Sequence, residues 1–277
     1  MPTAKSLLKR VLKKIKPTAK ETQQEQKIAD EIIEKIKKMK GHHIGAILAG
    51  SISRQTNLKG DKDIDIFVLF EENTPTEKFE KEGLRIGIAV FRGHKWEKAY
   101  SQHPYIRGNI NGFDIEIVPS YKVSDPLKIK SAVDRTPFHT KYLQEKLLPS
   151  QKDEVRLLRQ FLKGIKAYGA ELKTSSVPGY VTELLIIKYG SFEKTINAIA
   201  AWKEKEVIDL ENQLPKTDAQ KKFESPLIVV DPVDKNRNVA AALSINQFAK
   251  MIAASRAFQK KPSENFFFGK KTKPLST

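Results

Sequence analysis

The sequence predicts an α+β protein, with a domain of mixed strands and helices followed by a mainly helical domain that has a little β-sheet. Two patterns predict this class. Short apolar runs of β type are interleaved with helical segments between residues 44 and 121, whereas helical periodicity dominates from residue 154 onward. The length of 277 residues is enough to bury a sizeable core. We place the boundary at Pro149, which gives domains 1–149 and 150–277.

Two helices are expected at the N-terminus, separated by Pro17. Apolar residues recur at helical spacing from Leu7 to Ile15, with lysine and arginine on the other face. Thr18 and Glu21 form a capping-box pattern that opens the second helix. A basic amphipathic helix is also compatible with a membrane surface, but the break at Pro17 favours a scaffold role. The inner face of the second helix is expected to carry Ile28, Ile32, Ile33 and Ile36.

Four strands are expected in the first domain. They are the segments IGAILAG (44–50), DIDIFVLF (63–70), LRIGIAVF (84–91) and GFDIEIVPSY (112–121). The stretch GSISRQT (50–56) between the first two is predicted to be a turn that leads into a helix. This order of strands and helices is what defines the first domain.

The second domain is predicted to be mostly helical. Long helical patterns cover 154–172, 181–202 and 238–258, and FESPLIVVDP (223–232) is predicted to be a strand that ends at a proline. The last residues, KKTKPLST (270–277), are expected to be frayed.

Composition limits the classes of function. The formal net charge of +17 favours a polyanionic partner such as nucleic acid, although a merely soluble basic protein has the same sign of charge. The absence of cysteine excludes disulfides and thiolate metal sites. No apolar run is long enough for a membrane span, and the N-terminus lacks the core of a secretion signal. We therefore expect a cytoplasmic protein that does not associate with membranes.

Carboxylates alternate with apolar residues on two of the expected strands. Asp63 and Asp65 share one face of their strand, and Asp114 and Glu116 repeat the pattern on a later strand. Neighbouring carboxylates repel unless a cation lies between them, and Mg²⁺ prefers such oxygen ligands. A third carboxylate from the later strand would complete a site for two metal ions. The simpler alternative is that these residues are the solvated face of a half-covered sheet.

The turn before the first carboxylates makes a catalytic interpretation more specific. Gly50 allows close approach of the backbone to a ligand, Ser51 offers a hydroxyl and an amide, and Arg54 lies three residues further along the same helical face. These features suit the phosphates of a nucleotide. A phosphate-binding turn followed by paired strand carboxylates is more specific than either feature alone.

The stretch GSISRQTNLKGDKDIDIF resembles the signature of the DNA polymerase β-like nucleotidyltransferases. More narrowly, the chain resembles the archaeal-type (class I) CCA-adding enzymes, which are tRNA nucleotidyltransferases. This narrower resemblance rests on blocks that occur in the family's order and span most of the chain: AVDRTPFHTKYL (132–143), EVRLLRQFLKGIKAYGAE (154–171), PGYVTELLIIKYGSF (178–192), DPVDKNRNVAAALS (231–244) and PSENFF (262–267).

The resemblance implies a reaction and its metal ligands. The reaction is stepwise transfer of CMP and AMP from CTP and ATP to the 3′ end of tRNA, with release of pyrophosphate and with two Mg²⁺ ions. Asp63 and Asp65 correspond to metal-binding residues, and the first domain corresponds to the catalytic palm domain. Glu116 stands where the family has a third carboxylate that is usually aspartate, and Asp114 is an alternative for this position.

The resemblance also implies the nucleotide-binding residues. The residues that match triphosphate contacts of the family are Ser51, Arg54, Thr136, His139 and Tyr168. Arg159 stands where the family usually has lysine, which keeps the charge and changes its geometry. Arg237 matches the arginine that reads the incoming base. Without the resemblance, structural roles are favoured for all three: a buried structural histidine for His139, a core aromatic residue for Tyr168, and a helix-capping or ion-pair residue for Arg237.

The resemblance stops near the end of the chain. Members of the family continue past PSENFF into further domains that grip the elbow of tRNA. We expect one of three proteins: a compact enzyme that recognises the acceptor stem, the catalytic half of a split enzyme, or an enzyme that adds only CC or only A. Phe266, Phe267 and Phe268 form an interface for a second subunit or a homo-oligomer, or else fold back onto the second domain.

Two other functions share some of these features. An untemplated oligoadenylate-type polymerase of the same superfamily would have the same turn and the same carboxylates, but the blocks at 132–143 and 231–244 argue against it. An inactive RNA-binding subunit would keep the basic surface and lose the metal site. Because Asp63 and Asp65 are both present, this alternative depends on Glu116.

Overall fold

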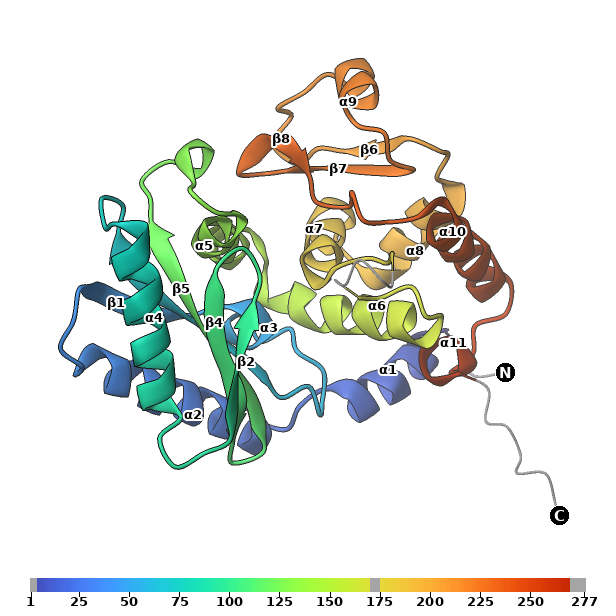
Figure 1. Ribbon diagram of the computed structural model, residues 1–277. Coiled ribbons are helices and arrows are strands. Elements are labelled where there is room, and N and C mark those ends of the chain that lie inside the picture. Colours follow the sequence, from blue (N-terminus) through green and yellow to red (C-terminus); the bar gives the residue numbers. More distant parts are fainter. Residues whose placement is uncertain (1–3, 170–174, 270–277) are drawn as a thin grey trace, which may run out of the picture. The chain divides into compact units, whose positions relative to one another are not determined.

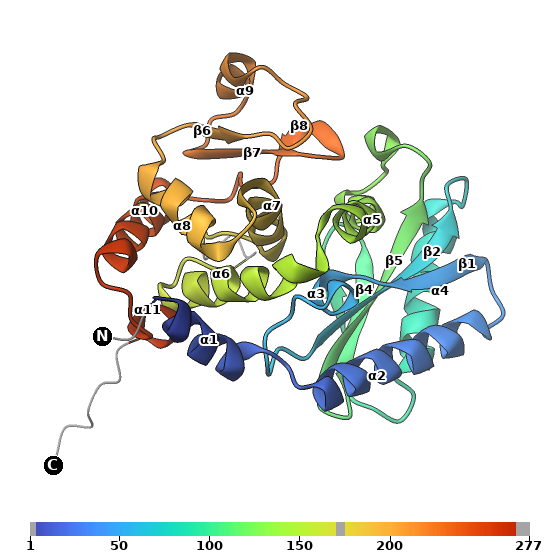
Figure 2. The same ribbon diagram turned by 180° about the vertical axis from the view of Figure 1, so that it is seen from behind.

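The computed structural model describes residues 4–169 and 175–269. The chain divides into two compact units, which we call the sheet unit (Pro17–Glu145) and the helical unit (Met1–Lys16 with Lys146–Thr277). Figures 1 and 2 show the elements of both units from opposite sides.

The sheet unit contains a five-stranded mixed sheet in the order β1-β2-β5-β4-β3. Strands β2 and β5 are parallel neighbours at its centre, and the other neighbouring pairs are antiparallel. Its elements are α2 (Ala19–Lys37), β1 (His43–Leu48), α3 (Gly50–Arg54), β2 (Asp63–Glu71), α4 (Thr76–Val90), β3 (Trp96–Tyr100), β4 (Pro104–Ile110), β5 (Phe113–Lys122), the short 3₁₀ turns η1 (Pro126–Lys128) and η2 (Ala132–Arg135), and α5 (Thr136–Lys146).

Helix α2 begins with the predicted capping box. The side chain of Thr18 accepts a hydrogen bond from the backbone N–H of Glu21 at 3.2 Å, and the Glu21 carboxylate accepts from the backbone N–H of Thr18 at 2.7 Å. Two backbone donors at the helix start are satisfied in this way. The prediction of a second helix that starts at this point is confirmed.

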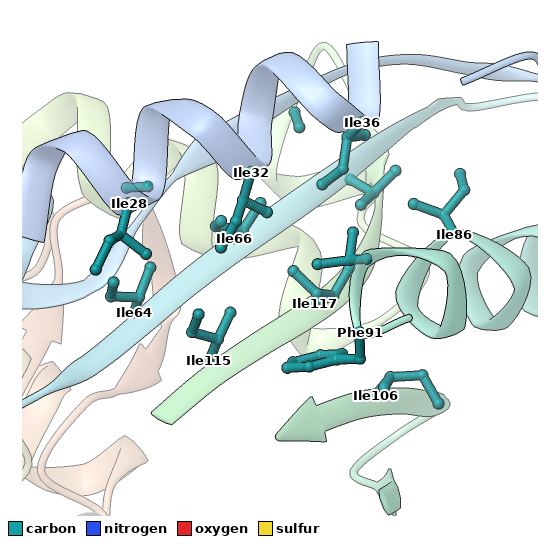
Figure 3. Packing of buried hydrophobic residues seen from close by; sticks show 14 of the residues in the cluster. Ile28, Ile32, Ile36, Ile64, Ile66, Ile86, Phe91, Ile106, Ile115 and Ile117 are labelled. Carbon is teal, nitrogen blue, oxygen red and sulfur yellow. The ribbon is translucent and has the colours of Figure 1, made fainter. Parts of the chain in front are cut away.

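The core of the sheet unit lies between α2, α4 and one face of the sheet. Isoleucines of α2 point toward those of β2 and β5, as Figure 3 shows. Alternation along the strands buries Ile64 and Ile66 on this face and places Asp63 and Asp65 on the other. The same packing that builds the core therefore sets the direction of the carboxylates. The predicted inner residues Ile28, Ile32 and Ile36 are buried, and Ile33 is partly buried.

The prediction of a strand over residues 84–91 is wrong, because residues 84–90 are the second half of α4 and Phe91 is its C-cap. Its apolar residues alternate locally, but the buried positions follow helical spacing. Two glycines allow the helix to lie directly on the sheet. A Cβ at Gly83 would lie 2.7 Å from Pro119, and one at Gly87 would lie 2.6 Å from Ile106. Close packing against the sheet, rather than local alternation, decides the structure of this segment.

The remaining two strands of the sheet, β3 and β4, were not predicted from the sequence. They form an antiparallel hairpin at the edge of the sheet, in which Trp96 pairs with Gly108 and Tyr100 with Pro104. Every residue of β3 except Ala99 is exposed, so this strand lacks the alternation of polar and apolar residues that marks a half-buried strand.

The helical unit combines packed helices with a three-stranded sheet in the order β6-β7-β8. Strands β6 and β7 are parallel, and β7 and β8 are antiparallel. Its elements are α1 (Ala4–Ile15), the 3₁₀ turn η3 (Pro149–Gln151), α6 (Lys152–Gly164), α7 (Gly179–Tyr189), α8 (Phe192–Ala201), β6 (Glu206–Ile208), α9 (Lys216–Lys222), β7 (Leu227–Asp231), β8 (Asp234–Asn238), α10 (Ile245–Lys260) and α11 (Asn265–Phe268).

The helices of this unit are shorter than the sequence patterns suggested. Helix α6 ends at Gly164, where an added Cβ would lie 2.2 Å from the carbonyl oxygen of Phe266. Gly190, with φ of 88°, separates α7 from α8 inside one continuous apolar pattern. Helix α10 starts at Ile245 rather than at residue 238. Residues 270–277, which were predicted to be frayed, lie outside the described residues.

Helix α1 groups with the helical unit, although it precedes the sheet unit in the chain. It packs against α6, and Lys16 forms an ion pair with Asp153 at 2.8 Å. Arg10 also pairs with Glu264 at 3.2 Å. The compact units therefore differ from a simple division at Pro149, because α1 lies with the C-terminal part of the chain.

The three consecutive phenylalanines near the C-terminus fold back onto the helical unit, which is one of the two predicted alternatives. The side chain of Phe267 is fully buried and contacts Phe161, Phe192 and Phe258, with ring centroids 5.7–5.8 Å apart. Phe266 stacks on Phe161 at 6.0 Å. Phe268 remains 45% exposed. These contacts make the end of α11 part of the core of this unit.

Replacing Phe267 by Ala should destabilise the helical unit. Deletion of a fully buried aromatic ring leaves a cavity among three other rings, and such changes cost about 3–5 kcal/mol. We expect a loss of that size in the free energy of unfolding, measured by urea denaturation. Phe268→Ala, in the same helix but at an exposed position, should cost less than about 1 kcal/mol. Equal losses for the two variants would contradict the packing described above.

None of the helices within residues 4–169 and 175–269 combines the length and the apolar character that spanning a membrane requires.

Candidate active site

Carboxylates from two adjacent strands meet on the face of the sheet that α2 and α4 leave uncovered. In the parallel pair of β2 and β5, Asp63 lies opposite Asp114 and Asp65 lies opposite Glu116. Because paired residues in neighbouring strands point to the same face, all four side chains project to one side. The structure thus places the predicted residues Asp63, Asp65 and Glu116 together.

The Gly50 turn lies directly against one of these carboxylates. The backbone N–H of Ala49 donates to the carbonyl oxygen of Asp65 at 2.8 Å, which fixes the turn to β2. Gly50 has φ of 67°, and a Cβ at this position would lie 2.1 Å from Oδ2 of Asp65. Glycine is therefore required both for the backbone conformation and for the approach of Asp65. The half-buried Ser51 follows at once in α3.

The electrostatics of the site centre on Asp65. Burial raises its pKa to about 6, and the negative charges of Glu116 and Asp63 act in the same direction. The positive charge of Arg54 opposes this rise. The predicted residue Arg54, at the end of α3, therefore lies near the carboxylates. An elevated carboxylate pKa with named charged neighbours is typical of functional sites.

The carboxylate of Glu116 is held by a neighbouring strand. The hydroxyl of Tyr105 donates to Oε1 of Glu116 at 3.3 Å, and Arg107 on β4 lies opposite Glu116 in the sheet. Burial raises the pKa of Glu116, whereas the hydrogen bond from Tyr105 and the charge of Arg107 lower it. Arg107 is itself paired with Glu97 at 2.6 Å.

The other two aspartates near the site have local partners. Oδ1 of Asp114 accepts a hydrogen bond from the amide of Asn109 at 2.9 Å, and the side chain is exposed. Oδ2 of Asp61 accepts from the backbone N–H of Leu58 at 3.3 Å in the turn before β2. Asp61 therefore stabilises this turn. Of the two carboxylates on β5, Glu116 is the one paired with Asp65, whereas Asp114 is paired with Asp63.

The carboxylates provide the kind of ligands that a hard divalent cation prefers. Asp63, Asp65 and Glu116 offer oxygen atoms, and a cation would offset the mutual repulsion that raises the pKa of Asp65. Among the described residues, no three His, Asp or Glu side chains already converge as a formed metal site. The chemistry of the donor set therefore fits the cation, and the hydroxyl of Tyr105 holds one oxygen of Glu116.

The 3₁₀ turn η2, which leads into α5, packs on the same face of the sheet as the carboxylates. Val133 packs against Phe67 and Val118, which follow Asp65 and Glu116 by two residues and so share their face. Thr136 and His139, the predicted phosphate contacts, are partly exposed and lie one helical turn apart on α5.

A buried carboxylate fixes this segment. Asp134 is fully buried and accepts hydrogen bonds from the backbone N–H groups of Tyr121 (2.9 Å), Lys130 (3.1 Å) and Ser131 (2.8 Å), and from the hydroxyl of Ser120. These bonds tie the turn before α5 to the end of β5. They fix the position from which Thr136 and His139 project.

The other three predicted nucleotide-binding residues belong to the helical unit. Arg159 is only 2% exposed, lies 3.8 Å from the buried Glu183, and has its guanidinium carbon 5.8 Å from the centre of the Tyr168 ring. Tyr168 itself is partly exposed. Arg237 on β8 forms an ion pair with the buried Asp231 at 2.9 Å and remains 39% exposed. Arg159 and Tyr168 are thus neighbours in this unit.

Tyr105 and Arg107 were missed by sequence reasoning. Both lie on β4, and they follow the two-residue alternation that places side chains on the carboxylate face. Recognition of the β3–β4 hairpin would have identified them.

The raised pKa of Asp65 predicts that Asp65→Asn stabilises the fold in the absence of metal. The pKa of Asp65 is about 6 in the folded state and 3.8 in its ordinary environment. Ionisation of this carboxylate therefore destabilises the folded state progressively as the pH rises from 3.8 to about 6, and the full cost is present above pH 6. Asp65→Asn should raise the free energy of unfolding by about 1–3 kcal/mol at pH 7.5 in EDTA. The gain should shrink as the pH falls through 6 and should nearly vanish at pH 4. Urea denaturation of both proteins across this range measures it, and a gain independent of pH would contradict the assignment.

The mixed sheet, the turn at Gly50 and the strand carboxylates are features of the DNA polymerase β-like nucleotidyltransferase fold. Residues 29–139 match the nucleotidyltransferase domain family. Solved structures share this fold over nearly the whole chain. A Cid1 poly(U) polymerase with Mg and 3′-dATP bound has a TM-score of 0.71 at 15% identity and covers 95% of this chain and 98% of its own. CdnC of E. coli MS115-1 with ATP has a TM-score of 0.68 at 16% identity, over 97% and 98%.

Sequence similarity points to a narrower group within this fold class. Residues 153–268 match the second domain of tRNA nucleotidyltransferases. The CCA-adding enzyme of Methanothermobacter thermautotrophicus is 40% identical over 262 residues, and that of Methanocaldococcus jannaschii is 42% identical over 276 residues. These matches cover 93% and 96% of this chain. The chain thus combines matches to both tRNA nucleotidyltransferase domain models and is similar to CCA-adding enzymes over more than nine tenths of its length, as the resemblance in its motifs indicated.

The chain spans 57% and 62% of the length of these two relatives. The match to the nucleotidyltransferase domain family, together with the Mg-bound structural neighbour, indicates dependence on a divalent cation.

Proposed function

We propose that this chain transfers CMP and AMP from CTP and ATP to the 3′ end of tRNA, without a nucleic-acid template and with release of pyrophosphate. The observation that carries the proposal is the packing of the Gly50 turn against Asp65, with Asp63 and Glu116 on the same face. This arrangement supports the proposal, because a turn that suits phosphates and carboxylates that suit a metal ion lie in one place. The similarity to CCA-adding enzymes supports tRNA as the acceptor.

The proposed metal ligands are Asp63, Asp65 and Glu116, and the proposed metals are two Mg²⁺ ions. When bound, they would lower the pKa of the attacking 3′ hydroxyl and offset charge on the leaving pyrophosphate. The protein's part is to hold these carboxylates ionised and in register. Arg54 and Arg107 favour the ionised forms of Asp65 and Glu116, and Tyr105 orients Glu116.

The residues around the carboxylates would bind the triphosphate. Ser51 and Arg54 follow the glycine turn, and Thr136 and His139 lie on α5 directly after η2, whose Val133 packs on the carboxylate face of the sheet. Cationic and hydroxyl groups in these positions suit phosphate oxygens and would offset charge that develops during transfer.

The helical unit would supply the remaining contacts of the nucleotide. Tyr168 offers a partly exposed ring, and the buried Arg159, with its guanidinium carbon 5.8 Å from the ring centre, would support that ring. Arg237 is fixed on one side by Asp231 and keeps an exposed guanidinium surface that can bond to the acceptor edge of a base.

Three tRNA substrates test the nucleotides that are added. They end before the first C, before the second C and before the terminal A, and each is incubated with labelled CTP or ATP. We expect extension of all three. Extension of only the first two identifies an enzyme that adds only CC, and extension of only the third identifies one that adds only A. Long adenylate tails without CTP use would indicate an oligoadenylate-type polymerase, and no extension of any substrate would contradict the proposal.

The acceptor stem of tRNA is the proposed recognition element, and a minihelix of that stem should be extended as well. A second subunit or a homo-oligomer that forms through the C-terminal region stays a prediction, and so does a cytoplasmic location. Size-exclusion chromatography with light scattering tests the oligomeric state directly.

A further inference from the structure

A groove on the sheet unit lies outside the site described above. It encloses about 850 Å³ between the second half of α4, the loop that follows it and the first residue of β3. Its apolar lining includes Leu84, Ile88 and Trp96. Ile88 is 41% exposed and Trp96 is 43% exposed. Large apolar side chains that gather at an exposed groove mark an interaction surface.

The groove also has a basic rim. Lys81, Arg85, Arg92 and His94 line it, and among the described residues that line it none is acidic. The structure shows no ion pair for the side chains of Lys81 and Arg92 among the described residues. Arg85 donates to the carbonyl oxygen of Lys40 at 2.6 Å and lies 4.0 Å from Glu82. The groove therefore presents positive charge around an exposed aromatic ring, which fits an anionic partner.

The strand register relates the groove to the carboxylates. Trp96 pairs with Gly108, and Gly108 pairs with Ile115, the neighbour of Glu116 in β5. Two strand spacings amount to about 10 Å, so both features lie at the same end of the sheet. Trp96 and Ile115 point to the same face of the sheet, so the groove lies on the face opposite that of Glu116. The edge strand β3 separates the groove on one face from the carboxylates on the other.

We propose that this groove binds RNA, with an unpaired base stacked on Trp96 and with phosphates contacted by Lys81, Arg85 and Arg92. An RNA strand that reaches the carboxylates can pass around the β3 edge into the groove. Base stacking together with cations along the backbone is the usual chemistry of single-stranded RNA sites. This assignment rests on the proposed function for its choice of RNA over an acidic protein segment.

The fluorescence of Trp96 can report directly on binding in the groove. The protein has two tryptophans, and Trp202 is 5% exposed and stacks on Phe248 with ring centroids 5.9 Å apart. In Trp202→Phe, all tryptophan fluorescence comes from Trp96. We expect tRNA that lacks its 3′ CCA to quench this fluorescence saturably. The wild type compared with Trp96→Phe gives the same information should Trp202→Phe fail to fold. No quenching at saturating tRNA would overturn the proposal.

Charge reversal tests the rim. Lys81→Glu/Arg92→Glu should weaken tRNA binding at least tenfold and should lower the slope of log affinity against log salt by about 1.5–2. The matched control, Lys20→Glu/Lys27→Glu on α2, makes the same change of net charge at exposed positions outside the groove. Equal losses in both double variants would mean that only overall charge matters, and would overturn the assignment. Equal quenching of Trp96 by poly-glutamate would assign the groove to acidic protein segments instead.

Nucleotide transfer measured in the same samples separates this proposal from the proposed function. Quenching of Trp96 without any CMP or AMP transfer would support the groove and contradict the function. Transfer without quenching would support the function and contradict the groove.

Discussion

Asp65→Asn should reduce nucleotide transfer by on the order of 10³-fold or more while leaving tRNA binding nearly unchanged. The substitution keeps the shape of the side chain and removes a negative charge from the centre of the carboxylate set, where Glu116 and Asp63 are close enough to shift the pKa of Asp65. Loss of a metal ligand forfeits several kcal/mol of stabilisation of the transition state. Single-turnover incorporation of labelled CMP measures the rate, and filter binding measures tRNA affinity.

Three further substitutions sharpen this test. Asp61→Asn makes the same chemical change in the turn before β2 and should leave the rate within a few fold of the wild type. Glu116→Gln and Asp114→Asn decide which residue of β5 is the third ligand. The register opposite Asp65 predicts that Glu116→Gln is the more damaging of the two. Retained activity in Asp65→Asn would refute the proposed metal role.

Gly50→Ala should also reduce transfer, by on the order of 100-fold. The new methyl group would lie 2.1 Å from Oδ2 of Asp65, so either the turn or the carboxylate must move. A displacement of about 1 Å in a catalytic group typically costs about 10²-fold in rate. The effect should appear in the rate of transfer at saturating nucleotide, and also as weaker nucleotide binding, because the same turn is proposed to hold the triphosphate.

Gly60→Ala is the matched control for the backbone. Gly60 also has a positive φ, of 87°, but no atom lies within 4 Å of a Cβ at that position. In both variants alanine adopts a left-handed conformation, which destabilises the folded state by about 1–2 kcal/mol. Only Gly50→Ala also displaces Asp65. If Gly60→Ala were to lose as much activity as Gly50→Ala, strain rather than contact with Asp65 would be the cause.

The central part of the site was predictable because each signal was local. Alternation along residues 63–70 assigned Asp63 and Asp65 to one face, and the cap at Thr18 marked the start of α2. The pairing of Asp65 with Glu116 was open until the parallel register of β2 and β5 was known, since the two residues are distant in the sequence. The family resemblance, rather than the spacing, pointed to Glu116.

The wrong and missing strand predictions concern segments whose structure depends on contacts with residues distant in the sequence, which the local pattern of residues does not show. Residues 84–91 alternate like a strand, yet they lie in a helix because Gly83 and Gly87 allow α4 to pack closely on β4 and β5. The exposed strand β3 lacks an apolar face, so neither it nor its partner β4 was found. The contacts of Tyr105 and Arg107 with Glu116 were missed for the same reason.

The most direct measurement of the central claim is the sequence of the product formed on a tRNA that ends immediately before CCA. The protein is incubated with that tRNA, CTP, ATP and Mg²⁺, and the 3′ ends are sequenced over time. The proposed function predicts addition of C, then C, then A, followed by a stop, with no extension in EDTA. Absence of any added nucleotide, or growth of an adenylate tail without cytidine, would contradict it.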